Sequence, residues 1–208
     1  MARTKSRKWF DWHPLRIDFD VSEWQSWISA GFSGLTISEG KRKELSKKEL
    51  QELLVKCWMT HDGAWFASCM HEYGIYAANR MNKAAIQALA PIELQRVSRA
   101  LGLKNGEVGT FSELEEVINA AFQVVKGDFM DFTFDFPEKN AFRWSMNRCF
   151  ALEGMKRMGA YEQYECGVLY RVFCWLDSLG LEYTVEPPVE GCLMRETGRC
   201  SGLVRFGL

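Results

Sequence analysis

The pattern of apolar and polar residues changes its period once along the chain. From Leu50 to Gly102 apolar residues recur every three or four positions, which is the period of a helix with one buried face. Ser46 and Glu49 precede this pattern and form a capping-box sequence, so we expect the first helix to begin there. Residues 45–126 therefore predict a helical bundle.

Three residues divide the helical region. Gly74 stands where a glycine commonly ends a helix, and Gly63 is a further candidate break. Pro91 suits the first turn of a helix, so we expect a separate helix from Ile92 to Leu101. Another short helix is expected from about Ser112 to Val125.

After Gly127 apolar and polar residues alternate, which is the period of a strand with one buried face. Residues 129–136 and 141–146, with a turn between them, predict a β-hairpin. We expect two helices and two more strands to follow: Cys149–Met158, Cys166–Leu179, Glu182–Glu186 and Leu203–Leu208. The pattern predicts an α+β protein, with an N-terminal helical bundle followed by an antiparallel sheet and two packed helices.

Residues 1–44 differ from the rest because they hold four of the eight tryptophans without a regular period. We interpret them as a Trp-rich N-terminal arm. The expected division is then 1–44, 45–126 and a cysteine-rich α+β region at 127–208, with 45–208 as one compact unit. An arm with exposed tryptophans can pack onto a neighbouring copy, which suggests a homo-oligomer.

Length and charge exclude several classes of protein. The 208 residues, 47% of them apolar, are enough for a packed core. The formal net charge of −1 gives no basic field, so we expect no nucleic acid and no membrane as partner. There is no secretion signal and no stretch of the ~20 apolar residues that a membrane span needs, so we expect a cytoplasmic protein with reduced thiols.

Four cysteines fall where the predicted sheet elements end. Cys149 follows the second strand, Cys166 begins a helix, and Cys192 and Cys200 lie between the last strands. If these ends meet, four thiolates form a tetrahedral site for zinc, or alternatively for an iron–sulfur cluster. Their separations match no standard zinc ribbon. Inert buried thiols and reactive thiols are the other readings of the same pattern.

A second candidate site lies on the first helix. On a continuous helix His61 and Glu72 fall near one line, where they replace an apolar stripe. Polar groups on a buried stripe are costly unless they line a cavity, so we interpret them as a catalytic pair. The expected ligand-binding residues around them are Trp58, Asp62, Trp65 and Asn79. Alternatively, Thr60 or Asp62 caps a helix there, and Gly63 breaks the register.

The sequence also resembles two known groups of proteins. Trp58-Met-Thr-His-Asp-Gly-Ala-Trp65 and Glu72-Tyr-Gly-Ile75, together with the four cysteines, are similar to a bacterial cytosolic family related to the L-2-amino-thiazoline-4-carboxylic acid hydrolases. The likeness runs from about residue 45 to residue 208. Glu190-Gly-Cys192 and Gly198-Arg-Cys200 resemble more loosely the ending of the vinyl-reductase-like small-molecule-binding domain, with spacings that differ by one residue each.

Two functions follow from these observations. The first is a metal-binding protein, with cysteine-ligated zinc or an iron–sulfur cluster, that also binds a small molecule in a Trp-lined cavity. The second, which the first resemblance implies, is a hydrolase of a small cyclic amide or amidine. Four thiolates around one metal leave no open position for a catalytic water, which favours the first function.

Overall fold

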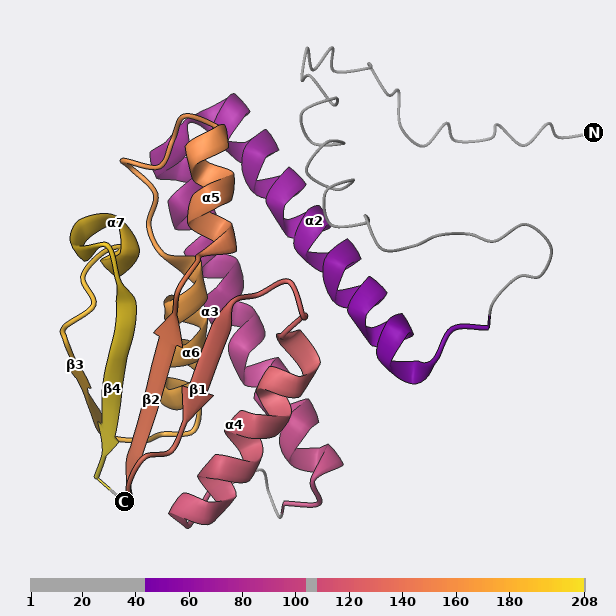
Figure 1. Ribbon diagram of the computed structural model, residues 1–208, viewed down its shortest axis with the longest axis vertical. Coiled ribbons are helices and arrows are strands. Elements are labelled where there is room, and N and C mark those ends of the chain that lie inside the picture. The colour runs from indigo at the N-terminus through magenta and orange to yellow at the C-terminus, as the bar shows by residue number, and fades with distance from the viewer. Residues whose placement is uncertain (1–43, 104–107, 208) are drawn as a thin grey trace, which may run out of the picture. The chain divides into compact units, whose positions relative to one another are not determined.

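Two long helices begin the described part of the chain. The computed structural model describes residues 44–103 and 108–207 (Figure 1). Helix α2 (Lys47–Tyr73) begins at Ser46, whose hydroxyl accepts from the Glu49 amide at 3.3 Å while Ser46 N donates to the Glu49 carboxylate at 2.9 Å. Helix α3 (Ile75–Ala100) follows after Gly74, which has a φ of 81° that favours glycine. The predicted capping box and the break at Gly74 are confirmed.

Two predicted interruptions are wrong. Gly63 lies inside α2 without ending it, and Pro91 lies inside α3, so residues 92–100 belong to the same helix as residues 75–91. A proline inside a helix removes one hydrogen bond. The neighbouring Ala90 and Leu94 are almost fully buried, and this packing keeps the helix continuous. Helix α4 (Phe111–Val125) is capped by Thr110, close to the predicted start.

The sheet has four antiparallel strands in the order β1-β2-β4-β3. The predicted hairpin is confirmed as β1 (Phe132–Asp135) and β2 (Ala141–Met146). Strand β4 (Cys200–Phe206) pairs along the whole of β2, and β3 (Tyr183–Glu186) forms the other edge. Strand β4 begins three residues earlier than expected.

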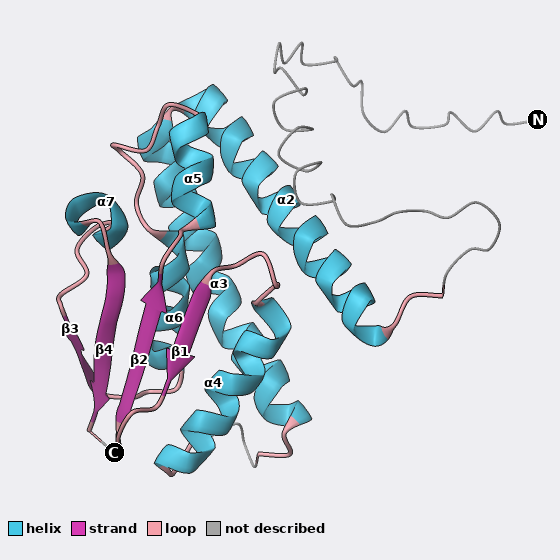
Figure 2. Cartoon of the chain, viewed as in Figure 1, coloured by secondary structure: helices cyan, strands magenta, loops and turns pink. Residues whose placement is uncertain are grey.

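Three shorter helices complete the fold. Helices α5 (Phe150–Arg157) and α6 (Gly167–Ser178) are those predicted, whereas α7 (Leu193–Thr197), between β3 and β4, was not expected. Figure 2 shows the helices and the single sheet that together make the α+β architecture predicted from the sequence.

The core lies between the helices and one face of the sheet. Along β2 the side chains of Phe142, Trp144 and Met146 are buried, whereas Arg143 on the opposite face is exposed. Phe122 of α4 packs against this face and also meets Trp175 of α6 edge to face at 5.4 Å. Helices and sheet therefore share one hydrophobic core.

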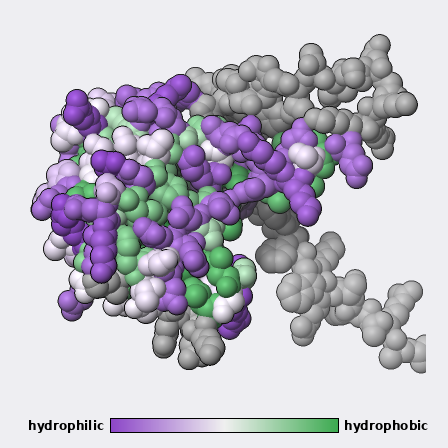
Figure 3. All heavy atoms as spheres, turned by 60° about the horizontal axis from the view of Figure 1, so that its bottom comes forward, coloured by the Kyte–Doolittle hydropathy of each residue, from purple (hydrophilic) through white to green (hydrophobic). Residues whose placement is uncertain are grey.

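The surface is mixed. Figure 3 shows mainly polar side chains (purple) with apolar ones (green) between them. Leu54 and Trp65 on α2 are 70% and 66% exposed. Within residues 44–103 and 108–207, no helix is long and apolar enough to cross a membrane. The predicted arm lies outside the described residues except for Glu44, and its role stays a prediction.

Candidate functional site

The four-thiol site, which we define as Cys149, Cys166, Cys192 and Cys200, lies at one end of the sheet. Strand β2 ends at Met146, which pairs with Cys200 at the start of β4. Cys149 follows β2 and is the N-cap of α5, and Cys192 is the N-cap of α7, the helix that leads into β4. Figure 1 shows α7 directly above the start of β4. The pairing of two strand ends thus brings three of the cysteines together.

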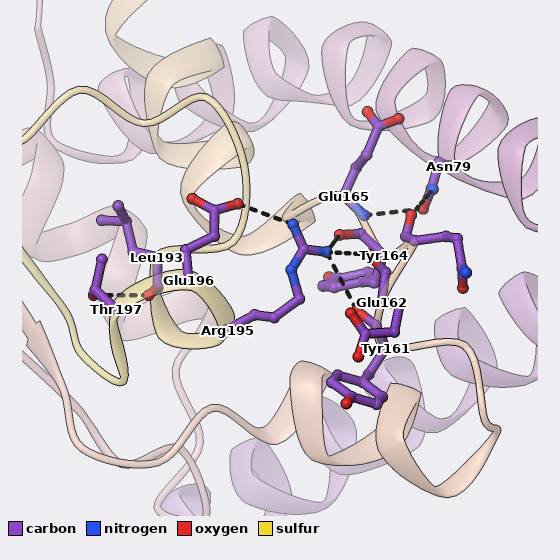
Figure 4. Close-up of polar contacts among 10 residues, drawn as sticks. Asn79, Tyr161, Glu162, Tyr164, Glu165, Leu193, Arg195, Glu196 and Thr197 are labelled. Carbon is purple, nitrogen blue, oxygen red and sulfur yellow. Dashed lines mark hydrogen bonds and ion pairs between the residues drawn. The ribbon is translucent and has the colours of Figure 1, made fainter.

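Cys166, the N-cap of α6, reaches this end through a segment that Arg195 holds in place. The Arg195 guanidinium donates hydrogen bonds to the carbonyl oxygens of Tyr161, Glu162 and Tyr164 at 3.3, 2.6 and 3.0 Å (Figure 4). Arg195 stands three residues after Cys192, and Tyr164 two residues before Cys166. These bonds therefore join the segments that carry the two cysteines.

Asn79 of α3 holds the same segment from the other side. Its side-chain amide donates to the carbonyl oxygen of Gln163 at 2.7 Å and accepts from the amide of Glu165 at 3.3 Å (Figure 4). Asn79 is only 1% exposed. A buried amide whose two ends both bind backbone groups positions a loop, so the structure places Asn79 beside the four-thiol site and not in a pocket with His61.

Burial and the neighbouring thiols raise the pKa of Cys149, Cys166 and Cys200. Burial raises the pKa of Cys149, and the nearby Cys192 raises it further. Burial raises the pKa of Cys166 to about 12 and that of Cys200 to about 11; Cys149 and Cys192 raise both values, and Cys200 also raises that of Cys166. These effects agree with the placement of the four cysteines at one end of the sheet.

Several N–H groups point at these sulfurs. The Leu152 amide donates to Cys149 Sγ at 3.5 Å, and the Leu169 amide acts on Cys166 in the same way, which lowers the pKa of that thiol against the larger effect of burial. The Tyr164 hydroxyl is also beside the site, because burial first and the thiols of Cys166, Cys149 and Cys192 next raise its pKa. Hydrogen-bond donors such as the amides of Leu152 and Leu169 stabilise a thiolate more than a thiol.

The donor set suits a soft metal, but the thiols are not arranged around a single point. Within residues 44–103 and 108–207, no three side chains of His, Cys, Asp or Glu are placed to hold one metal ion. Four sulfurs are the ligands that structural zinc and iron–sulfur clusters prefer. The roles of the four cysteines as ligands therefore stay predictions, although the structure brings them together.

The structure does not bring the predicted catalytic pair together. His61 and Glu72 stand eleven residues apart on α2, which is about 16 Å along a helix axis. Their side chains are 78% and 47% exposed, and each lies beside its sequence neighbour, Asp62 or His71. The stripe that the sequence analysis took as buried is the outer face of α2.

Trp58 and Asp62 belong instead to a charged group between helices. The guanidinium of Arg171 lies 4.5 Å from the Trp58 ring and forms a two-bond ion pair with Glu93, which also accepts from Trp175 Nε1 at 2.9 Å. Partial burial raises the pKa of Asp62, while the charge of Arg171 opposes this. Sequence reasoning missed Glu93 and Arg171 because they lie on different helices, α3 and α6.

A groove of about 420 Å³ lies between the start of α2, the end of α4 and β1. Phe122 and Phe134 line it and stack on each other with ring centroids 4.3 Å apart. Charged side chains of both signs, among them Lys48 and Asp128, also line it. The sequence analysis expected a cavity around Trp58 and Trp65 and missed this one.

Comparison with known proteins gives a family but no activity. No curated protein matches the sequence. A family of unknown function, DUF6125, matches residues 43–168, which include Cys149, Cys166 and Asn79. Because the match covers more than half of the chain, the protein belongs to the DUF6125 family.

Proposed function

We propose that this protein binds a metal through its four-thiol site and a small molecule elsewhere in the same fold. The observation that supports the metal is the convergence of four cysteines from four separate segments at one end of the sheet. Cys149, Cys192 and Cys200 are only 6%, 3% and 5% exposed, so a bound ion is shielded from water. Zinc and an iron–sulfur cluster are the two candidates.

A buried thiolate needs compensation for the hydration that it loses. Each thiolate loses its hydration, and a bound metal replaces the lost interaction with direct bonds. The amides that point at Cys149 and Cys166 stabilise the remaining charge. Because all four ligands come from the protein, no position stays open for a substrate, so we assign the metal a structural or redox role.

The groove between α2 and α4 is our candidate for the small-molecule site. Partly buried Phe134, which stacks on the core residue Phe122, offers an apolar contact for a ligand, and Lys48 and Asp128 offer charges of both signs. Its volume suits a small metabolite. This groove differs from the ligand site that the sequence predicted around Trp65, whose side chain is 66% exposed.

A hydrolase activity is the alternative that the resemblance to the aminothiazoline-carboxylate hydrolases implies. The separation of His61 from Glu72 does not support it, and neither does a metal with four protein thiolates. Incubation of the purified protein with cyclic amides and amidines, followed by detection of ring-opened product, tests it. Turnover that the His61→Ala variant loses would overturn our preference.

Metal content tests the main proposal. Protein purified without air and without a metal-binding tag is expected to hold zinc or iron, and Cys192→Ser is expected to lose it and to unfold at lower denaturant concentration. Cys174→Ser is the matched control, because Cys174 is also buried but lies eight residues beyond Cys166 on α6, about 12 Å away. Equal metal content in both variants, or none in the wild type, would contradict the proposal.

A further inference from the structure

Helix α2 carries an apolar stripe on its outer face. Its members are exposed and stand three or four positions apart, so they lie on one side of the helix: Leu50, Leu54, Cys57, His61 and Trp65. Leu54 and Trp65 are 70% and 66% exposed, and the Cys57 thiol is free. Single apolar side chains on a surface are ordinary, but a row of them along one helix is typical of a surface that meets a partner.

A charge of opposite sign stands beyond each end of this stripe. Lys47 lies seven residues before Leu54, and Glu72 lies seven residues after Trp65, which is two helical turns in both cases. Both charged side chains therefore share the side of α2 that carries the stripe, and both are exposed. Glu72 Oε1 lies 3.8 Å from His71 Nδ1, which is longer than a hydrogen bond, so the carboxylate can accept another partner.

This arrangement is complementary to itself when a second copy lies antiparallel. Leu54 and Trp65 have the same midpoint in the sequence as Lys47 and Glu72. A two-fold axis at that midpoint therefore places Leu54 opposite Trp65 of the other copy and Lys47 opposite Glu72 of the other copy, and each contact occurs twice. A parallel pairing places Lys47 against Lys47 and Glu72 against Glu72, and like charges repel. The charges thus favour one orientation and one register.

The size of the stripe sets the strength of such an association. From Lys47 to Glu72 the helix is about 38 Å long, and with its side chains it is about 10 Å wide, so each copy offers about 400 Å². The total of about 800 Å² is less than a standard interface of about 1,600 Å² and matches weak, transient assemblies. We therefore expect a dissociation constant of roughly 10–100 μM.

We propose that two copies of this chain associate through the outer face of α2, with the two helices antiparallel. This surface differs from the arm at 1–44, through which the sequence analysis expected copies to meet. It is also separate from the proposed small-molecule site, because Lys48 and Glu52, which line the groove, lie on another side of α2. The inference is therefore independent of the proposed metal and ligand.

The molecular mass of the full-length protein tests the association. Sedimentation equilibrium from about 1 to about 300 μM is expected to show a rise from the mass of one chain towards that of two. Leu54→Glu is expected to raise the dissociation constant at least about tenfold, because it puts a carboxylate opposite each Trp65. Ile92→Glu is the matched control, since Ile92 is 45% exposed on α3, and it is expected to leave the constant unchanged. The mass of one chain at every concentration, or a Leu54→Glu protein that associates like the wild type, would overturn the proposal.

A charge exchange tests the antiparallel register. Lys47→Glu and Glu72→Lys are each expected to weaken the association several-fold at low salt, because each places like charges opposite one another twice. The double variant restores opposite charges at both ends and is expected to associate like the wild type. Single variants with the wild-type dissociation constant, or a double variant no tighter than the single ones, would overturn this register.

Discussion

Substitution of Gly202 by alanine tests the packing that supports Trp144. The added Cβ would lie 2.5 Å from Trp144 Cζ2 and 2.7 Å from the carbonyl oxygen of Glu186 on the neighbouring strand β3. The ring can move only by leaving its buried position, and the strand carbonyl only by distorting the sheet. Overpacking of a core typically costs 1–3 kcal/mol, and two rigid neighbours place this site near the upper end, at about 3 kcal/mol.

The control for this substitution is Gly154→Ala in α5. No atom lies within 4 Å of a Cβ at Gly154, so alanine there is expected to stabilise the protein by about 0.5–1 kcal/mol through helix propensity. Equilibrium urea unfolding in the presence of a chelator, which keeps metal binding out of the comparison, measures both. A Gly202→Ala protein within 0.5 kcal/mol of the wild type would refute the position of the indole across β4.

Two further predictions concern the segments around the thiols. Arg195→Met removes three hydrogen bonds to loop carbonyls and is expected to destabilise the protein by about 2 kcal/mol and to speed metal loss to a chelator. Arg205→Met is the control, because it breaks an exposed ion pair with Glu138. It is expected to cost less than about 1 kcal/mol and to leave metal loss unchanged. In metal-free protein the free energy of unfolding is expected to fall as pH rises from 9 towards 12. The reason is that burial raises the pKa of Cys166 from 9.0 to about 12, so the folded state keeps a proton that the unfolded chain releases. Urea unfolding over this pH range checks the second prediction, and a flat profile would contradict it.

The period of the sequence predicted most of the fold, because helices and hairpins are specified by nearby residues. The capping box at Ser46 and the alternation around Phe132 each depend on fewer than ten residues, and both are found in the structure. The failures at Gly63 and Pro91 have different causes. A glycine costs a helix only about 1 kcal/mol, so Gly63 does not end α2. Pro91 is tolerated because Ala90 and Leu94 are packed in the core, and the sequence does not show that packing.

The two candidate sites show what periodicity leaves open. It correctly indicated that positions 54, 61 and 72 share a line on α2, but not that this line faces outward: Leu54 is 70% exposed, whereas Val55 and Phe66 are buried. The meeting of the four cysteines was easier to predict from the sequence, because strand pairing alone brings the end of β2 to the start of β4. Arg195 was not predicted, since its partners lie about thirty residues earlier and a five-residue helix has no readable period.

The same geometry helps to separate the three readings of the cysteines. Burial raises the pKa of Cys166 well above that of an exposed thiol, which disfavours a reactive thiolate in the metal-free protein. The Leu152 amide donates to Cys149 Sγ at 3.5 Å, and such a donor favours a thiolate over a thiol. The proposed metal would remove the thiol protons and leave charge for this amide to stabilise. Because its ligands come from four segments that meet only in the folded chain, its binding would also add directly to the stability of the fold.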